Sequence, residues 1–575
     1  MPPRVARAWL VLALAPLISA DALEQGTCSG ASCGRASGDE AGLIQTKHPS
    51  SRRQRPNIVY MVADQWRWDW AGFHDIGMEH LMPNLRKLAK LGTRFNYAYS
   101  PSPLCTPSRC SFVQGVHFEN SFVQNNGVDC LVPEEKTYLH RLEQAGYTTM
   151  ISGKDHLSGA TRGVGINGSR MSKALGYTVQ RWRTDDKYEI CSRDYSPVEP
   201  YGNQMYESNA EDFDYQAHCY GSAGTGSCCT SGEFGCDYES PVKQPGPALC
   251  GFHCPVASKV DELDSIDAWT QRNAEKLVED HLDTRPGTPW YISVGFPSPH
   301  PPFILSPTEN ETVSELQLQP PHDNRRIPPE LVNQTRRQYA GNVLRIDYLI
   351  GKMVAFLREK NLFDNTLIIV SADHGEHAGD WGQYGKMSSM EPSVRVPMVV
   401  VGPGVQRDRV VDEPVETLDL VATMLDFAGT TPQPEMETRT MRPFLTGAQA
   451  KPPREQVTTG IETTLEGAFF HAVIQKFPHR NTTFKLVCCY FATATGGGCL
   501  KQGPFLPPPE NQTTSAVTLM SVDNRSPGDV ENLMQQPAAD RPCAEAWEMM
   551  QAVPWRYGRW CAPALETLCG QRGSK

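Results

Sequence analysis

The chain has 575 residues, which is enough for one large domain with a substantial buried core and a smaller second domain. Hydrophobic residues make up 39% of it and charged residues 21%, as in an ordinary soluble globular protein. The formal net charge of -11 argues against nucleic acid as a partner, because phosphate binding needs a basic surface. A local cluster of cations could still bind an anionic substrate.

Residues 1–22 have the pattern of a secretory signal peptide. Arg4 and Arg7 precede an apolar run over residues 8–18, and small residues follow as a cleavage site. The alternative is an N-terminus that is merely apolar. The run is too short to span a bilayer and no other stretch is long enough, so we expect no membrane span. Residues 23–54 are rich in Gly, Ser and charge and are expected to form a flexible leader.

Alternating strands and helices are predicted from residue 55 onward. The apolar run Asn57–Ala63 is typical of a buried strand. A helix is expected to begin at Pro83, with Leu85 and Leu88 on one face. The next predicted elements are a helix over residues 136–145 and a strand over residues 147–152.

Residues 160–255 differ in composition from their surroundings. Their seven cysteines lie among many Gly, Ser and Tyr residues, which indicates a disulfide-stapled insertion rather than core. A zinc site is the alternative, but the spacings match no standard zinc pattern and secretion favours disulfides.

Helix–strand alternation resumes after this insertion. It predicts an α/β domain over residues 55–430 with a largely parallel sheet. Pro and Thr crowd residues 430–456, so residues 431–575 are expected to form a smaller C-terminal domain. The expected elements are a helix over 265–281, a strand over 290–296, a long helix with Val343, Ile346, Ile350, Met353 and Leu357 on its buried stripe, strands over 366–372 and 397–401, and a helix over 418–427.

Polar side chains follow three of the predicted strands, at the edge where open α/β sheets form their sites. Carboxylate and amide oxygens together with an imidazole suit a hard divalent cation such as Ca²⁺ or Mg²⁺. For either acidic pair alone, a helix cap is the more ordinary explanation. The residues are Asp64 and Gln65 after the first strand, Asp373 and His374 after the strand over 366–372, and Lys154 and His156 after the strand near residue 147.

The segment Leu104-Cys-Thr-Pro-Ser-Arg109 contains the motif Cys-x-Pro-Ser-Arg. Because this motif is the family's signature, the sequence resembles the type I sulfatase family of the alkaline phosphatase-like superfamily. The resemblance covers about residues 55–540, apart from the Cys-rich insertion. It implies an alkaline phosphatase-like α/β fold, with helices flanking a mostly parallel central sheet, and a smaller α+β C-terminal domain. The other family blocks occur in the correct order and begin at Arg55, Pro83, Ser152, Pro297, Ser371, Tyr384, Glu391 and Asp529.

By this resemblance, Cys105 is oxidised to formylglycine by a formylglycine-generating enzyme in the secretory pathway. Water adds to the aldehyde, one hydroxyl of the resulting diol attacks sulfur, and the other expels sulfate, which avoids a stable sulfate ester. The alternative is a disulfide from Cys105 to Cys110 or Cys130; a bridge to Cys110 would abolish activity.

The resemblance also implies roles for the other residues. A sulfate ester is negatively charged and its leaving oxygen gains charge, so the site must supply fixed positive charge and a proton donor. Solvated lysines and a loop histidine are the ordinary alternatives for Lys154, Lys386 and His300. The implied roles are metal binding by Asp64, Gln65, Asp373, His374 and the oxygen derived from Cys105, stabilisation of the diol by Arg109, sulfate binding by Lys154, Lys386 and His300, leaving-group protonation by His300, and base catalysis by His156.

Hydrolysis of a small-molecule or glycan sulfate ester, such as a sulfated carbohydrate or an aryl sulfate, is the predicted function. Three departures leave the substrate subclass open: Gln65 stands where many members have Asp, Trp381 where His is common, and Asp155 where an apolar residue is usual. A phosphonate or phosphate diester hydrolase and a catalytically silent binding protein, both on the same fold, are the alternatives.

The chain is expected to enter the secretory pathway and to reach an extracellular or lysosome-like compartment. Its 18 cysteines suit an oxidising environment. Asn-x-Ser/Thr sequons support the same route. They begin at Asn167, Asn310, Asn333, Asn481, Asn511 and Asn524.

Overall fold

The computed structural model of the chain describes residues 55–126, 128, 130–157, 179–180, 256–257, 265–301, 303–322, 329–463, 468–489, 517–522 and 533–570. The expected signal peptide and leader, nearly all of the Cys-rich insertion, residues 529–532 of the last family block and the sequons at Asn167, Asn511 and Asn524 lie outside these residues.

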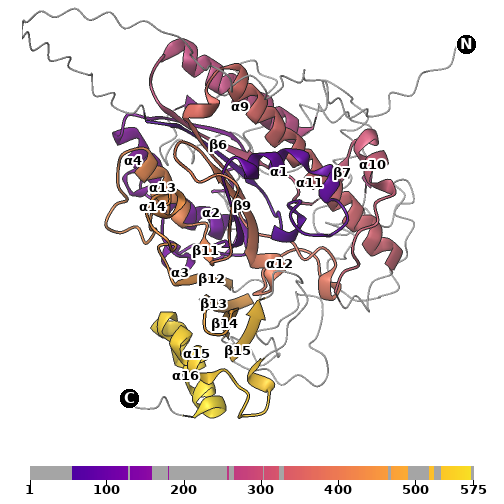
Figure 1. Cartoon of the computed structure of the whole chain (residues 1–575), viewed down its shortest axis with the longest axis vertical. Helices are drawn as coiled ribbons and strands as arrows, with labels where there is room; N and C mark the ends of the chain where they lie inside the picture. The colour runs from indigo at the N-terminus through magenta and orange to yellow at the C-terminus, as the bar shows by residue number, and fades with distance from the viewer. Residues whose placement is uncertain are drawn as a thin grey trace, which may run out of the picture. The chain divides into compact units, whose positions relative to one another are not determined.

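A nine-stranded sheet forms the centre of the described part of the chain (Figure 1). Its order is β10-β2-β9-β8-β1-β6-β3-β4, with β11 beside β2; β9 is antiparallel to β2 and β8, and the other pairs are parallel. Every residue of β1, β6 and β8 is buried, which explains why their sequences are largely apolar. The strands are β1 (Asn57–Ala63), β2 (Thr93–Tyr99), β3 (Thr148–Gly153), β4 (Val179–Gln180), β6 (Trp290–Phe296), β8 (Thr366–Ala372), β9 (Arg395–Val401), β10 (Arg409–Val411) and β11 (Val415–Glu416).

Helices cover both faces of this sheet. Figure 1 shows α1, α9 and α11 on one side and α2, α4 and α13 on the other; α9 packs on β3 and β6, and α4 packs on β3. Val343, Ile350 and Leu357 are buried, as the periodicity of α11 predicted. No helix in the described residues has the length and apolar content needed to cross a membrane. The helices are α1 (Pro83–Lys90), α2 (Cys105–Gln114), α3 (Phe118–Ser121), α4 (Tyr138–Gln144), α9 (Ile266–Thr284), α10 (Pro307–Ser314), α11 (Pro329–Glu359), α12 (Glu391–Val394), α13 (Asp419–Phe427) and α14 (Arg442–Leu445).

Strand β2 has no counterpart among the elements predicted from sequence. Its residues mix polar and aromatic types, yet six of the seven are buried. The hydroxyl of Thr93 donates to the carbonyl oxygen of Gln406 at 3.0 Å, and the Asn96 amide donates to Asp412 at 2.6 Å. Because tertiary hydrogen bonds satisfy these polar groups, the strand can be buried without an apolar pattern.

A four-stranded antiparallel sheet, ordered β12-β13-β14-β15, forms much of the C-terminal part. Successive residues of its strands point to opposite faces. Leu486 and Leu519 pack in a cluster with residues of α15 and α16, whereas Val487 and Met520 pack in a second cluster with Tyr99 of β2. The smaller sheet therefore lies between its own helices and the edge region of the larger sheet. The elements are β12 (Gln456–Thr463), β13 (Ala468–Phe477), β14 (Thr482–Cys489), β15 (Val517–Val522), α15 (Cys543–Met549) and α16 (Trp555–Cys569).

Candidate active site

Four neighbouring strands of the central sheet, β8, β1, β6 and β3, end at the same edge of the sheet. Because all four are parallel, their carboxyl ends meet there. The N-terminus of α2 and the loop before α12 reach the same place. The side chains brought in are Asp64 and Gln65 after β1, Lys154 and His156 after β3, His300 in the loop after β6, Asp373 and His374 after β8, Cys105 and Arg109 on α2, and Lys386 in the loop before α12.

Two carboxylates, a thiol and an imidazole converge at this edge. One donor atom from each of Asp64, Cys105, Asp373 and His374 lies within 4.8 Å of the others, and all four residues are buried. Nδ1 of His374 donates to the carbonyl oxygen of Gly375 at 3.0 Å, so Nε2 is the ring nitrogen that faces the cluster. Neither aspartate lies at the start of a helix, so a helix cap does not explain the pair, and their carboxylate oxygens are ligands that a hard divalent cation prefers.

Gln65 connects this group to Lys386. Its backbone is left-handed, with φ at 68°, and its N–H donates to Asp373 Oδ1 at 3.0 Å. Its side-chain Oε1 accepts a hydrogen bond of 2.5 Å from Lys386 Nζ, and its Nε2 donates to Glu376. Lys386 is therefore held at the cluster, unlike the solvated lysine of the alternative interpretation.

Two further cations lie against the carboxylates. Arg109 donates to Asp373 at 2.8 Å and to the carbonyl oxygen of Lys154 at 3.0 Å, and it lies 3.5 Å from Asp64. The side chain of Lys154 is buried and pairs with Asp64, which excludes a solvated surface position. Burial and Cys105 raise the pKa of Asp64, but Lys154, His300 and Lys386 outweigh them and hold that pKa below its ordinary value. At neutral pH the carboxyl group of Asp64 is therefore ionised.

Cys105 begins α2 and lies at the centre of the cluster. Its Sγ is 3.1 Å from His374 Nε2, 3.7 Å from Asp64 Oδ1 and 3.0 Å from Lys386 Nζ. Burial raises the pKa of the thiol, but Lys386, Lys154 and His374 together lower it well below its ordinary value. Within the described part of the chain, Cys105 is the free cysteine.

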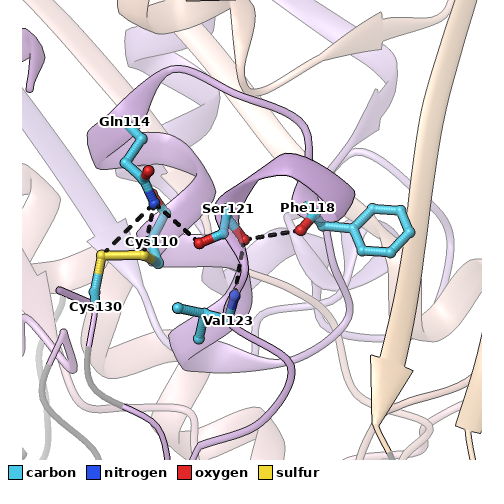
Figure 2. Close-up of a disulfide and its surroundings, with 6 residues drawn as sticks. All are labelled: Cys110, Gln114, Phe118, Ser121, Val123 and Cys130. Atoms are coloured by element: carbon cyan, nitrogen blue, oxygen red, sulfur yellow. Dashed lines mark hydrogen bonds between the residues drawn. A yellow bond between two sulfur atoms is a disulfide. The ribbon is translucent and has the colours of Figure 1, made fainter. Parts of the chain in front are cut away.

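The two cysteines that could have paired with Cys105 pair with each other instead. Figure 2 shows the disulfide between Cys110 and Cys130, which joins α2 to the segment that precedes α4. Gln114, on the next turn of α2, lies against this disulfide, with its Nε2 3.0 Å from Cys110 Sγ and 3.4 Å from the carbonyl oxygen of Ser121. The disulfide alternative for residue 105 is therefore not realised.

Two histidines complete the cluster. His156 is buried, with a left-handed backbone of φ 47°; burial and Lys154 lower its pKa to about 4. His300 donates from Nδ1 to the carbonyl oxygen of Pro301 at 2.6 Å, and burial, Lys386 and Lys154 lower its pKa. At neutral pH both imidazoles are therefore mostly neutral and can accept a proton.

Glu376 is a site residue that the sequence pattern did not reveal. It is buried and accepts hydrogen bonds from Gln65 and from the backbone N–H groups of Ala378 and Gly385. Its one sequence signal is an acidic residue shortly after Asp373. That signal is weak, because acidic residues are common in loops.

Known proteins resemble this chain in both sequence and fold. The family model described as Sulfatase matches residues 56–430, and one described as N-sulphoglucosamine sulphohydrolase, C-terminal, matches residues 379–496. Choline-sulfatase from Rhizobium meliloti (strain 1021) is 26% identical over 435 residues, which are 71% of this chain and 73% of that protein. Arylsulfatase from Clostridium perfringens (strain 13 / Type A) is 25% identical over 400 residues, 65% of this chain and 75% of that protein.

The crystal structure of the phosphonate monoester hydrolase of Agrobacterium radiobacter superposes with a TM-score of 0.60 at 18% identity, over 89% of this chain and 96% of that one. The fold is thus the alkaline phosphatase-like α/β fold of sulfatases, with a mostly parallel central sheet and a separate C-terminal sheet. Since the sulfatase model matches well over half of its length, the chain belongs to the sulfatase family. It is a sulfuric ester hydrolase.

Proposed function

We propose that this sulfatase acts on the sulfate ester of a carbohydrate or an aryl alcohol, with a formylglycine nucleophile made from Cys105. Ca²⁺ would be held by Asp64, Gln65, Asp373 and His374. The observation that supports this most directly is the position of Cys105, which is unpaired, starts a helix and lies among Asp64, His374 and Lys386.

The donor set suits Ca²⁺, or Mg²⁺, because it offers carboxylate and amide oxygens close to one imidazole nitrogen. When bound, the cation would supply positive charge that polarises the sulfate. The formylglycine diol would supply a nucleophile that releases sulfate without a stable ester. Residue 105 cannot reach this state if it pairs with Cys110 or Cys130. The disulfide between those two residues keeps it unpaired.

The charged residues around Cys105 would each have a separate role in the reaction. Arg109 is held by Asp373 and the Lys154 carbonyl, so its charge stays fixed beside residue 105. Lys154 and Lys386 provide positive charge for the sulfate oxygens. With its pKa lowered to about 4, His156 is a neutral base.

His300 needs a proton to assist the leaving group. Without substrate, burial and the charges of Lys386 and Lys154 depress its pKa. A bound sulfate ester is an anion, so it offsets those two charges and raises the proton affinity of His300. This suits protonation of the leaving oxygen once the substrate is in place.

The test is mass spectrometry of the peptide that contains residue 105, from protein produced in a secretory host. Formylglycine weighs about 18 Da less than cysteine, and its aldehyde reacts with a hydrazide probe. Cys105→Ser is the matched control and should take up no probe. An unmodified thiol, or a cystine, at residue 105 in mature active protein would overturn the proposal.

A phosphonate or phosphate diester hydrolase is the second candidate, favoured by Gln65. An amide oxygen binds Ca²⁺ but leaves the site one unit less negative than a carboxylate would. Values of kcat/KM for an aryl sulfate, an aryl phosphonate and a phosphate diester distinguish the two candidates. The sulfate should be the best substrate.

We also propose that the protein matures in the secretory pathway, where it would meet a formylglycine-generating enzyme, and that it ends in an extracellular or lysosome-like compartment. The disulfides Cys110–Cys130 and Cys543–Cys569 support an oxidising compartment. Asn333 and Asn481, which begin two of the sequons, are exposed and accessible to glycosylation.

A further inference from the structure

The side-chain amide of Gln65 lies between two groups of opposite hydrogen-bonding character. A carboxylate only accepts hydrogen bonds and an ammonium only donates them. Glu376 lies on one side of the amide and Lys386 on the other. The amide therefore satisfies both neighbours in one orientation alone, with Nε2 toward Glu376 and Oε1 toward Lys386 and the metal-binding cluster.

Glu376 is itself held firmly, so it can impose this orientation. Its Oε1 accepts from the backbone N–H groups of Ala378 at 2.9 Å and Gly385 at 2.6 Å, which directs Oε2 to Gln65. Gly385 immediately precedes Lys386, so the same carboxylate also fixes the loop that carries this lysine. Both oxygens of Glu376 are thus occupied by hydrogen bonds.

The main chain of Gln65 is also fixed. Its N–H donates to Asp373 Oδ1 at 3.0 Å, and its carbonyl oxygen accepts from the Tyr339 hydroxyl at 2.8 Å. The backbone cannot swing to offer the cation a different atom. Glu376 then determines whether Oε1 or Nε2 of the Gln65 side chain faces the cluster.

We propose that Glu376 is a positioning residue that holds the Gln65 oxygen toward the cation, and that it is the reason why this chain carries an amide at position 65. A carboxylate there would set two acceptors of like charge against each other in a buried place. This inference rests on the proposed cation site. It adds to that site Glu376, the residue that orients the ligand Gln65.

An isosteric exchange tests the pair directly. In Gln65→Glu, two carboxylates face each other; in Glu376→Gln, two amide NH₂ groups face each other, and Gln65 must turn its own NH₂ toward the cation. The double variant Gln65→Glu/Glu376→Gln restores one donor and one acceptor. Its two side chains together have the same size and the same total charge as in the wild-type protein. Ca²⁺ affinity of the full-length protein, measured by isothermal titration calorimetry, is the readout.

Glu376→Gln should lose about 10- to 100-fold in Ca²⁺ affinity, as changes to partners of metal ligands commonly do. The double variant should regain most of this loss. Thermal unfolding of all three variants shows that they are folded. A double variant that binds Ca²⁺ no better than the weaker single variant overturns the inference.

Asp347→Asn is the matched control. Asp347 is also a buried carboxylate that accepts from two backbone N–H groups and one amide, those of Asn84 and Leu85, but it lies in α11 against α1. This variant should lower the melting temperature and leave Ca²⁺ affinity unchanged. If it lost as much Ca²⁺ affinity as Glu376→Gln, the loss in Glu376→Gln would be a general consequence of removing a buried carboxylate, and the inference would be overturned. Absence of Ca²⁺ binding by the wild-type protein would instead overturn the proposed cation site, and with it the need to aim Gln65.

Discussion

Arg109 illustrates at the residue scale why geometry matters as much as charge in this site. Its guanidinium reaches Asp373, the carbonyl oxygen of Lys154 and Asp64 from three different nitrogens, at 2.8, 3.0 and 3.5 Å. A lysine has the same charge but a single nitrogen at the end of a flexible stem, and it cannot reach three acceptors in fixed directions.

Arg109→Lys should therefore lower kcat/KM on an aryl sulfate by at least about 100-fold, the cost of losing one fixed donor in such a site. It should also lower the free energy of unfolding by about 1–3 kcal/mol, because a buried acceptor is left unpaired. Steady-state kinetics and urea unfolding measure the two effects. Arg407→Lys, at an exposed position, is the control and should change neither. A kcat/KM near the wild-type value would contradict a fixed role for the guanidinium.

The sequence located most of this site because its residues follow strands. Asp64, Lys154 and Asp373 come directly after runs whose apolar character predicts strands, and parallel strands bring such positions together. The roles assigned to these residues remain predictions. Glu376 could not be found in this way, because its importance lies in a contact with Gln65, which is 311 positions away in the sequence.

At the scale of elements, the sequence predicted the buried strands that are also apolar. The strands β1, β6 and β8 are buried along their whole length and were predicted residue for residue from their apolar runs. Strand β2 buries polar side chains that find partners elsewhere in the fold, such as Asn96 with Asp412, and it was missed. A pattern of apolar residues cannot report hydrogen bonds that form only after folding.

A second feature at this scale is a buried ionic connection between the start of α3 and the strands β11 and β12. His117 Nε2 lies 3.0 Å from Glu416, and His117 Nδ1 lies 3.3 Å from Glu437. Glu416 also accepts from the backbone N–H of Thr458 on β12 at 2.7 Å. Burial lowers the pKa of His117, but Glu416, Glu437 and Glu119 outweigh this and raise it well above its ordinary value.

The stability contributed by His117 should depend on pH in a defined direction. Its pKa is raised in the folded state, so the contribution is complete below its ordinary pKa of 6.5 and is lost as pH rises through the folded value. The pKa values of Glu416 and Glu437 are lowered to about 2, so their contribution is complete above 4.5 and is lost as pH falls toward 2. The network should stabilise most between these limits. His117→Gln should cost the most free energy of unfolding there and progressively less in alkaline solution, as followed by urea unfolding; a loss that does not change with pH would contradict this.

At the scale of the whole molecule, the C-terminal sheet contacts the loop that carries Lys386 of the candidate site. Lys485, buried on β14, donates to the carbonyl oxygen of Ser389 and to Glu391, each at 2.6 Å. Glu391 also accepts from the hydroxyl of Tyr99 on β2, at 3.0 Å. Ser389 lies three residues after Lys386. One side chain of the small sheet thus joins the two sheets to the loop that carries a site lysine.

Lys485→Met should therefore affect activity as well as stability. Removing one partner of a buried ion pair leaves Glu391 less well compensated, at a cost of about 3 kcal/mol in the free energy of unfolding. Loss of the bond to Ser389 releases the Lys386 loop, and small displacements of such groups lower kcat/KM by about 10- to 100-fold. The double variant Lys485→Met/Glu391→Gln removes the uncompensated charge, so it should recover part of the stability but not the activity. Urea unfolding and kcat/KM corrected for folded protein separate the two effects. Full activity of folded Lys485→Met would show that the C-terminal sheet supports the fold without positioning the site.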